Sequence, residues 1–201
     1  MFVPKVRWRD ARRWEKWEPR VINGTRYAFD HLLDFDMTLS RPPRGHLPAL
    51  RIPIRVVFDC HVVTESTELH SSDNPRADAS SWVDSGGRLR RFNPGRYIRS
   101  FRLRTLIKGL TEENARCYVA SAHNYMVYEH TTLEGSSEYY QVYFDLYRPS
   151  GEPRLVMYVQ SAYVKDHPTA ASRRHAKPFA MLCAEKVGAI PTKPKGNKKT
   201  P

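Results

Sequence analysis

The stretch "EYYQVYFDLYRPSGEPRLVMYVQSAYV", residues 138–164, decides the fold class of this chain of 201 residues. Apolar residues in 138–147 and 154–164 recur with a period of two, which is typical of strands with one buried face. The run RPSGEP between them holds the Pro and Gly of a tight turn. We therefore predict two antiparallel strands joined as a hairpin. In the second strand, Ser161 and Tyr163 continue the parity of Leu155, Met157 and Val159.

Other strand-like segments precede this hairpin. Residues 27–39, "YAFDHLLDFDMTL", alternate between apolar and polar side chains, and His31 falls on the apolar parity, where a satisfied core histidine is expected. Residues 51–65, "RIPIRVVFDCHVVTE", are apolar on both faces, which predicts a central strand. On such a strand Asp59 and His61 would share one face. His61 is then either a partly buried structural residue or part of a site.

The chain between and after these strands is less regular. Residues 66–95 are rich in Ser, Asp, Gly and Arg and read as a long loop, whereas 96–110 have helical spacing. Short strands are expected at 116–121 and 124–132. Residues 179–190, "FAMLCAEKVGAI", fit a strand or a short helix equally well.

These patterns predict an α+β fold: a single domain with a curved, mainly antiparallel sheet packed by one or two helices. The domain spans residues 27–191. A basic Trp/Arg-rich arm, 1–26, precedes it, and a basic tail, 192–201, follows with the composition of a disordered segment. The tryptophans of the arm could stack on bases or bury their indoles on the domain, and burial is the favoured reading.

Positive charge is concentrated at the two ends of the chain. The net charge is +12 at pH 7, of which residues 1–26 contribute +5 and residues 192–201 contribute +4, leaving +3 for the middle. Basic arms of this kind suit a polyanion, with nucleic acid, and RNA in particular, as the first candidate partner. Surface charge that only aids solubility is the alternative.

Cysteine usage and hydropathy bound the compartment. Cys60, Cys117 and Cys183 are too widely spaced for a CxxC motif, and an odd number without an export signal favours reduced, buried thiols. No apolar run is long enough to span a membrane, and the first residues do not resemble a signal peptide. We therefore expect a cytoplasmic protein without membrane association.

No strong catalytic motif is present: the chain lacks a P-loop, GxGxxG, HExxH, GxSxG and paired CxxC sequences. We therefore predict no metal and no cofactor. What remains is positional, because strand ends that meet basic loops form polar clefts. RNA cleavage by the 2′-hydroxyl needs a base, an acid and a cation. The candidate catalytic residues are His61, Arg96, Arg99, Ser161 and Tyr163.

The candidate nucleic-acid contacts come from two basic clusters, around residues 88–104 and 173–174. Guanidinium groups are well suited to phosphate contacts because they present several donors in a planar fork. These residues are Arg88, Arg90, Arg91, Arg102, Arg104, Arg173 and Arg174.

The runs "RRFNPGRYIRSFRLRTLIKGL", "RLVMYVQSAYVKD" and "KPFAMLCAEKV" resemble a family of small bacterial proteins of prophages and mobile elements, over roughly residues 50–187. The order of a helix followed by four strands is also similar to the RelE/barnase-like ribonuclease superfamily. The resemblance implies a nucleic-acid-directed protein, either a metal-independent ribonuclease-like toxin or a phage-defence effector. The alternative is a non-enzymatic protein of a mobile element that binds nucleic acid or another protein.

Overall fold

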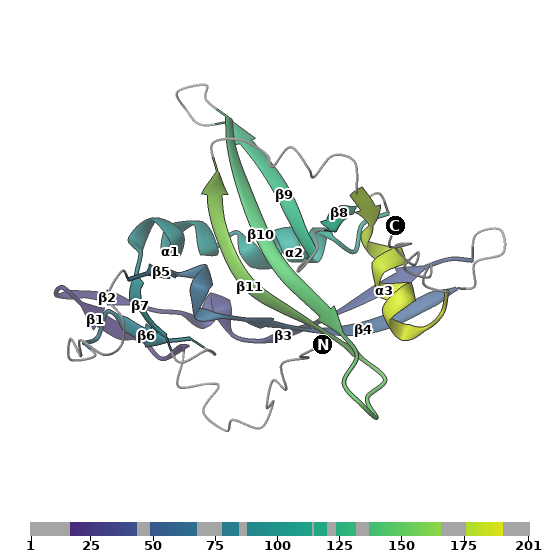
Figure 1. Cartoon of the computed structure of the whole chain (residues 1–201), viewed down its shortest axis with the longest axis horizontal. Helices are drawn as coiled ribbons and strands as arrows, with labels where there is room; N and C mark the ends of the chain where they lie inside the picture. Colours follow the sequence, from purple (N-terminus) through teal and green to yellow (C-terminus); the bar gives the residue numbers. More distant parts are fainter. Residues whose placement is uncertain are drawn as a thin grey trace, which may run out of the picture.

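The computed structural model describes residues 17–43, 49–67, 78–84, 88–113, 115–119, 124–131, 137–165 and 176–190. These residues form an α+β domain with one large and two small sheets (Figure 1), as predicted. The strands are β1 (Arg20–Ile22), β2 (Thr25–Tyr27), β3 (Phe35–Arg41), β4 (Leu50–Phe58), β5 (Thr64–Ser66), β6 (Ser81–Val83), β7 (Leu89–Phe92), β8 (Arg116–Val119), β9 (Asn124–Thr131), β10 (Ser137–Tyr147), β11 (Leu155–Lys165) and β12 (Ala176–Pro178). The helices are α1 (Pro94–Ser100), α2 (Leu103–Gly109) and α3 (Phe179–Val187), with 3-10 turns η2 (Asp30–Leu32) and η3 (Cys60–Val62).

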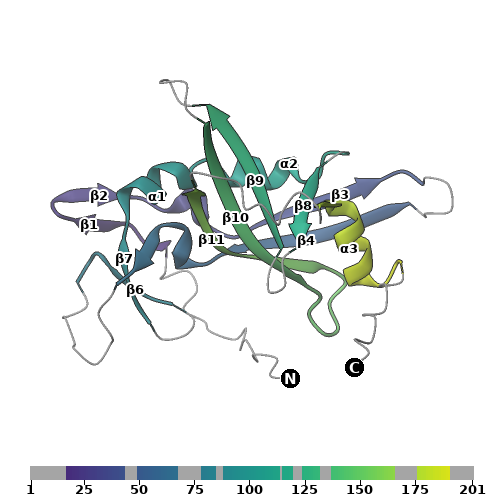
Figure 2. The ribbon, with the colours of Figure 1, turned by 45° about the horizontal axis from the view of Figure 1, so that its top comes forward.

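The large sheet has the strand order β12-β8-β9-β10-β11-β4-β3 (Figure 2). Its pairs are antiparallel except for β11 with β4, which run parallel. A parallel pair needs a long crossover connection. The chain between β4 and β11 supplies it, through β5–β7, the first two helices and β8–β10. The hairpin β10–β11 and the interior position of β4 are both confirmed.

The apolar face of the large sheet is covered by α2 and α3. Buried side chains of α2, such as Ile107, and of α3, such as Leu182, belong to the same core cluster as Val142 and Phe144 of β10. The rings of Phe144 and Phe179 meet at 6.3 Å. Residues 179–190, for which the sequence fitted a strand and a helix equally well, thus contain the helix α3. The helix is capped by Gly188, which has a left-handed φ of 77°.

A β-bulge in β11 changes which side chains share a face. The register places Val159 opposite Phe144 and Ser161 opposite Tyr143, so Gln160 is an extra residue. A bulge reverses the alternation of a strand beyond it. Val159 is buried before the bulge and Ala162 after it. The prediction that Ser161 and Tyr163 share the face of Val159 is therefore wrong, because an inserted residue leaves no mark on the apolar pattern.

The segment 51–65 is not one strand. β4 ends at Phe58, and residues 60–62 form η3, whose N-cap Asp59 accepts a hydrogen bond from the backbone N–H of His61 at 3.3 Å. A carboxylate at the N-cap of a turn accepts hydrogen bonds from backbone N–H groups that the turn leaves without a partner. Asp59 and His61 therefore lie together through a turn, rather than by alternation on a strand.

The range predicted as a long loop, 66–95, contains two strands. β6 and β7 pair with each other, and β7 also pairs with β5, to form a three-stranded antiparallel sheet. Residues 68–77 and 85–87 of this range lie outside the described part. The predicted helix over 96–110 is divided into α1 and α2 at Phe101 and Arg102, and Asn93 caps α1 by accepting from the N–H of Arg96 at 2.9 Å.

An aromatic cluster joins the small sheets to α1. Phe29 is fully buried, and its ring contacts those of Trp17, Trp82, Phe92 and Tyr97 at 5.5–6.2 Å. These residues come from the N-terminal segment, β6, β7 and α1. The predicted burial of N-terminal indoles is thus confirmed for Trp17, while Trp8 and Trp14, like the tail 192–201, lie outside the described residues.

The three cysteines are buried thiols that form no disulfide, as predicted. Burial raises the pKa of the Cys117 thiol to about 12. Burial also raises the pKa of the Cys183 thiol, so both thiols stay protonated and unreactive. Among the described residues, no helix combines the length and apolar character needed to cross a bilayer.

His31 is a half-buried structural histidine. Its Nε2 lies 2.7 Å from Ser100 Oγ, and its ring stacks on Phe101 at 3.9 Å. Burial lowers its pKa from 6.5 to about 4, opposed by the charge of Asp30 and assisted by that of Arg104. The imidazole is therefore neutral in the folded protein at pH 7.

This pKa predicts a stability that declines in mild acid. The unfolded chain takes up the proton below about pH 6.5 and the folded chain only near pH 4, so stability is lost as pH falls between these values. Because His31 is half exposed, we expect a loss of only about 1 kcal/mol. His31→Gln should remove it. Urea titrations near pH 8 and pH 5 test this, and an equal pH dependence in both proteins would contradict it.

Candidate functional site

A polar cleft of 510 Å³ opens between the large sheet and the segment that leads into β7. The bulge in β11 aims residues on both sides of it at this cleft, because the parity that faces the cleft switches at Gln160. The turn after β4 supplies the opposite wall. The cleft is lined by Asp59, His61, Arg88, Tyr143, Tyr158, Gln160, Ser161 and Tyr163.

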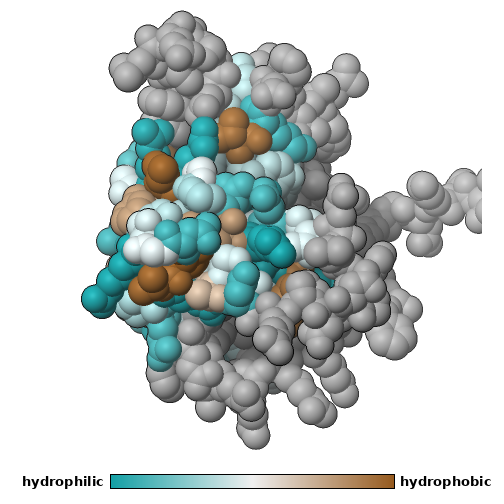
Figure 3. Space-filling view, turned by 90° about the vertical axis from the view of Figure 1, so that its left-hand side faces the viewer, coloured by the Kyte–Doolittle hydropathy of each residue, from teal (hydrophilic) through white to brown (hydrophobic). Residues whose placement is uncertain are grey.

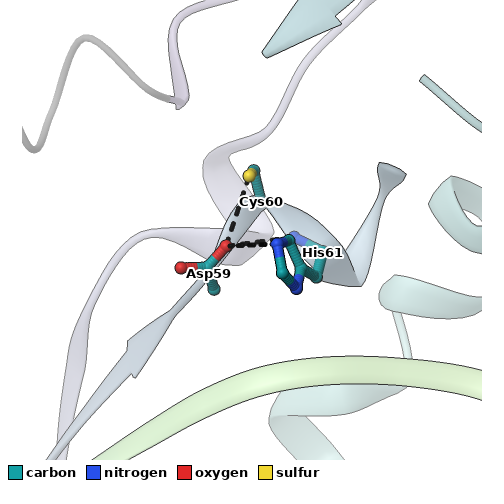
Figure 4. A group of neighbouring side chains, drawn as sticks. All are labelled: Asp59, Cys60 and His61. Carbon is teal, nitrogen blue, oxygen red and sulfur yellow. Dashed lines mark hydrogen bonds and ion pairs between the residues drawn. The ribbon is translucent and has the colours of Figure 1, made fainter. Parts of the chain in front are cut away.

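His61 lies between two buried carboxylates. Its Nε2 is 3.1 Å from Asp84 Oδ2 and 3.8 Å from Asp59 Oδ1. The side chains of Asp59 and Asp84 are 5% and 1% exposed, and that of His61 is 21% exposed. Figure 4 shows Asp59 and His61 on the same side of the turn, with the imidazole beside the carboxylate. The histidine is therefore the member of this group that reaches solvent.

Both carboxyl groups accept hydrogen bonds from neighbouring donors. Asp84 accepts from the backbone N–H and the Nε of Arg88, each at 2.9 Å. Asp59 accepts from the Cys60 thiol at 3.2 Å and from the Tyr158 hydroxyl. Hydrogen bonds to a charged carboxylate stabilise it against burial. The Tyr158 hydroxyl is thereby committed to Asp59 and does not project freely into the cleft.

The pKa of His61 is lowered from 6.5, first because burial penalises the imidazolium. Asp59 opposes this shift, Arg90 adds to it, and the hydrogen bond to Asp84 opposes it. A neutral imidazole whose Nε2–H is donated to Asp84 keeps a lone pair on Nδ1. Such a group can accept a proton at neutral pH, with Asp84 fixing its tautomer and orientation.

Arg96 and Arg90 support the turn that carries His61. Arg96 donates from Nη1 to the carbonyls of His61 at 2.9 Å and Thr64 at 2.6 Å, and its guanidinium lies 5.3 Å from the centre of the Tyr163 ring. Burial lowers its pKa. Arg90 is 7% exposed and donates to Thr64 Oγ1 at 3.0 Å. Neither lines the cleft, so both act by fixing the position of His61 and its neighbours.

The structure thus brings together His61, Ser161 and Tyr163 of the candidate catalytic residues. Arg96 lies behind them, and Arg99 donates to Gly95 O at 3.3 Å within its own helix instead of lining the cleft. Among the described residues, the cation that lines the cleft is Arg88, whose side chain is 73% exposed.

The predicted nucleic-acid contacts are divided among different environments. Arg91 and Arg102 are exposed. In the strand register, Arg91 lies opposite Glu65 of β5 and Ser81 of β6. Arg104 donates to Leu33 O at 2.7 Å. The prediction that Arg90 contacts nucleic acid is wrong, because Arg90 is buried and donates hydrogen bonds to Thr64 inside the domain. Arg173 and Arg174 lie outside the described residues.

Sequence reasoning missed Asp84 and Tyr158. Asp84 follows β6 in a range that resembled a loop, and nothing in its spacing links it to His61. Tyr158 lies on the parity opposite to Ser161, and only the bulge brings the two to one cleft. A polar residue at the end of an apolar strand was the one available signal for Asp84.

The same corner offers metal-ligand atoms. One donor atom from each of Asp59, Cys60 and His61 lies within 4.8 Å of the others. In this geometry the Cys60 thiol is fully buried and donates to Asp59, which also accepts from Tyr158. An ion would need Cys60 deprotonated and the Tyr158 bond broken, so the hydrogen-bonded arrangement fits a metal-free site better.

The fold and cleft define an α+β protein with a histidine oriented by a buried carboxylate. The model of the YjaZ family matches residues 19–187, and the chain belongs to this family. No curated protein and no solved structure matches the chain. The family match contains the predicted range 50–187. The prophage origin and the likeness to RelE/barnase-like ribonucleases stay predictions.

Proposed function

We propose that the protein cleaves RNA at this cleft by metal-independent internal phosphodiester transfer. The observation that carries the proposal is the position of His61, which lies 3.1 Å from the buried Asp84 and opens to a cleft of 510 Å³ that is also lined by Arg88 and Tyr163. A general base needs a pKa below the working pH together with a fixed orientation, and His61 has both.

The chemistry can be assigned to groups that face the cleft. His61 Nδ1 accepts the proton of the ribose 2′-hydroxyl, and O2′ attacks the phosphorus atom. The bond from phosphorus to O5′ breaks, and O5′ takes a proton from the Tyr163 hydroxyl. The products are a 2′,3′-cyclic phosphate and a 5′-hydroxyl end, and solvent later restores both proton carriers.

Arg88 serves as the cation that stabilises the pentavalent phosphorane. It is the guanidinium that lines the cleft, and it would take over the role first expected of Arg96 and Arg99. Ser161 contributes a hydroxyl to the same wall and orients the phosphate. Tyr158 is not assigned the acid role because its hydroxyl is bound to Asp59.

Such an activity fits a cytoplasmic toxin or phage-defence effector of a prophage or other mobile element, with RNA as its partner. Binding without catalysis, to nucleic acid or to a protein, is the second candidate. The observation that favours it is that Arg102 is exposed but does not line the cleft, so it could bind a partner without taking part in cleavage.

Digestion of matched oligonucleotides in EDTA tests the proposal. Purified protein should cleave a labelled single-stranded RNA and leave DNA of the same sequence intact, because DNA lacks the attacking 2′-hydroxyl. Chelation of divalent ions should not reduce the rate, since no step uses a metal. Intact RNA, equal cleavage of both strands, or complete inhibition by EDTA would each contradict it.

A further inference from the structure

Three large apolar side chains in or near α1 are exposed and do not line the cleft: Ile98 and Phe101 are three residues apart, and Leu33 is two residues from His31, on which Phe101 stacks. Ile98, Phe101 and Leu33 are 69%, 53% and 42% exposed, and we call this group the Ile98 patch. Figure 3 shows several separate hydrophobic residues exposed among hydrophilic ones on the face that contains α1. Large apolar side chains that gather at the surface instead of entering the core commonly mark interaction sites.

The patch is held rigidly by the residues beneath it. Phe101 stacks on His31 at 3.9 Å and meets Tyr97 edge-on at 5.1 Å. His31 is in turn fixed by Ser100, and the Leu33 carbonyl accepts from Arg104 at 2.7 Å. A surface that is already ordered loses little conformational entropy when a partner binds.

The surroundings of the patch carry more basic than acidic side chains. Arg99, Arg102, Arg104 and Lys108 lie in or beside α1 and α2, whereas Asp30 and Asp34 lie close to Leu33 in the chain. Residues 88–110 contain eight Lys or Arg and no Asp or Glu. Arg99 and Arg102 flank the patch along the chain, and Arg102 and Lys108 are exposed. Within the described part of the chain, neither Arg102 nor Lys108 forms an ion pair with an acid. The excess of basic over acidic side chains therefore favours an occupant that carries negative charge.

We propose that the Ile98 patch binds an acidic, amphipathic segment of a protein partner. Apolar side chains of the segment pack on Ile98, Phe101 and Leu33, and its carboxylates pair with Arg99, Arg102 and Lys108. A protein suits this surface better than RNA does, because Ile98 and Leu33 offer no ring to a base and one face of Phe101 is already covered by His31.

This site is separate from the RNA cleft but joined to it through one helix. Ile98 follows Arg96 by two residues, so their side chains point to nearly opposite sides of α1. The inner side holds the carbonyl of His61 through Arg96, and the outer side binds the partner. This inference does not depend on the proposed RNA cleavage, because its test measures only the binding of a peptide.

Fluorescence anisotropy with a designed probe tests the proposal. The probe is a labelled synthetic helical peptide of about five turns with Leu on one face and Glu on the other. The double variant I98S/F101S should weaken its binding about tenfold or more, and so should R99E/R102E. The matched control V21S/V83S removes apolar residues that are 59% and 64% exposed on β1 and β6, and should change the affinity less than about twofold.

A peptide with Lys in place of Glu, and a labelled single-stranded RNA, complete the design. The account predicts no binding of the Lys peptide and RNA binding that I98S/F101S does not alter. It is overturned if the Glu peptide fails to bind, if V21S/V83S weakens binding as much as I98S/F101S, or if the patch variants lower RNA affinity instead.

Discussion

Replacing His61 with alanine should reduce the rate of RNA cleavage about 10²–10⁴-fold, the usual contribution of a positioned general base. The effect should fall on kcat, because His61 acts on the 2′-hydroxyl proton more than on the binding of the strand. In the wild-type protein the acidic limb of the kcat/KM profile should lie below pH 6.5, since burial lowers the pKa of the imidazole and only its neutral form accepts a proton. Initial rates on a labelled RNA across pH provide both quantities.

His31→Gln is the matched control for this variant. Both histidines have a pKa lowered by burial, yet His31 lies against Ser100 and Phe101, away from the cleft. The control should keep its activity at neutral pH within about twofold. Equal losses in the two variants, or full activity in His61→Ala with an unchanged thermal transition, would remove His61 from the mechanism.

Replacing Phe29 with alanine should cost about 3–5 kcal/mol of folding free energy. Phe29 is fully buried, and its ring is the point at which β6, β7, α1 and the N-terminal segment meet. Its loss leaves a cavity that four large rings cannot close without moving. For a chain of this size the midpoint of thermal unfolding should fall by about 10 °C.

Phe101→Ala is the appropriate comparison, because it removes the same side chain from a position that is 53% exposed. We expect it to cost about 1 kcal/mol or less. Urea titrations followed by circular dichroism measure both variants. If Phe29→Ala were no less stable than Phe101→Ala, the aromatic cluster would not be what joins the small sheets to the domain.

The strands β3 and β10 were predictable because their apolar residues recur with a period of two. Phe35, Met37 and Leu39 alternate with more exposed residues in β3. In β10, Tyr140, Val142, Phe144 and Leu146 recur with the same period, although Gln141 between them is also buried. Helix α3 was not predictable, because residues 179–184 form a short unbroken apolar run in which the helical and strand periods cannot be told apart. The break between α1 and α2 leaves the apolar spacing intact, so the sequence reads as a single helix.

The site was predictable only in part, because its geometry depends on local irregularities. His61 was identified through its neighbour Asp59, although a turn and not a strand brings the two together. Ser161 and Tyr163 reach the cleft beside Tyr158 because Gln160 is inserted into β11. Asp84 approaches His61 from a position 23 residues further along the chain, a contact that only the tertiary fold specifies.

The chemical identity of the ends produced in the RNA digest tests the central claim most directly. Mass spectrometry of the products should find a 2′,3′-cyclic phosphate, or the monophosphate formed when it opens, on one fragment and a 5′-hydroxyl on the other. These ends require attack by the neighbouring hydroxyl that His61 is proposed to deprotonate. Fragments with a 3′-hydroxyl and a 5′-phosphate would mean that water attacks the phosphorus, and would contradict the account.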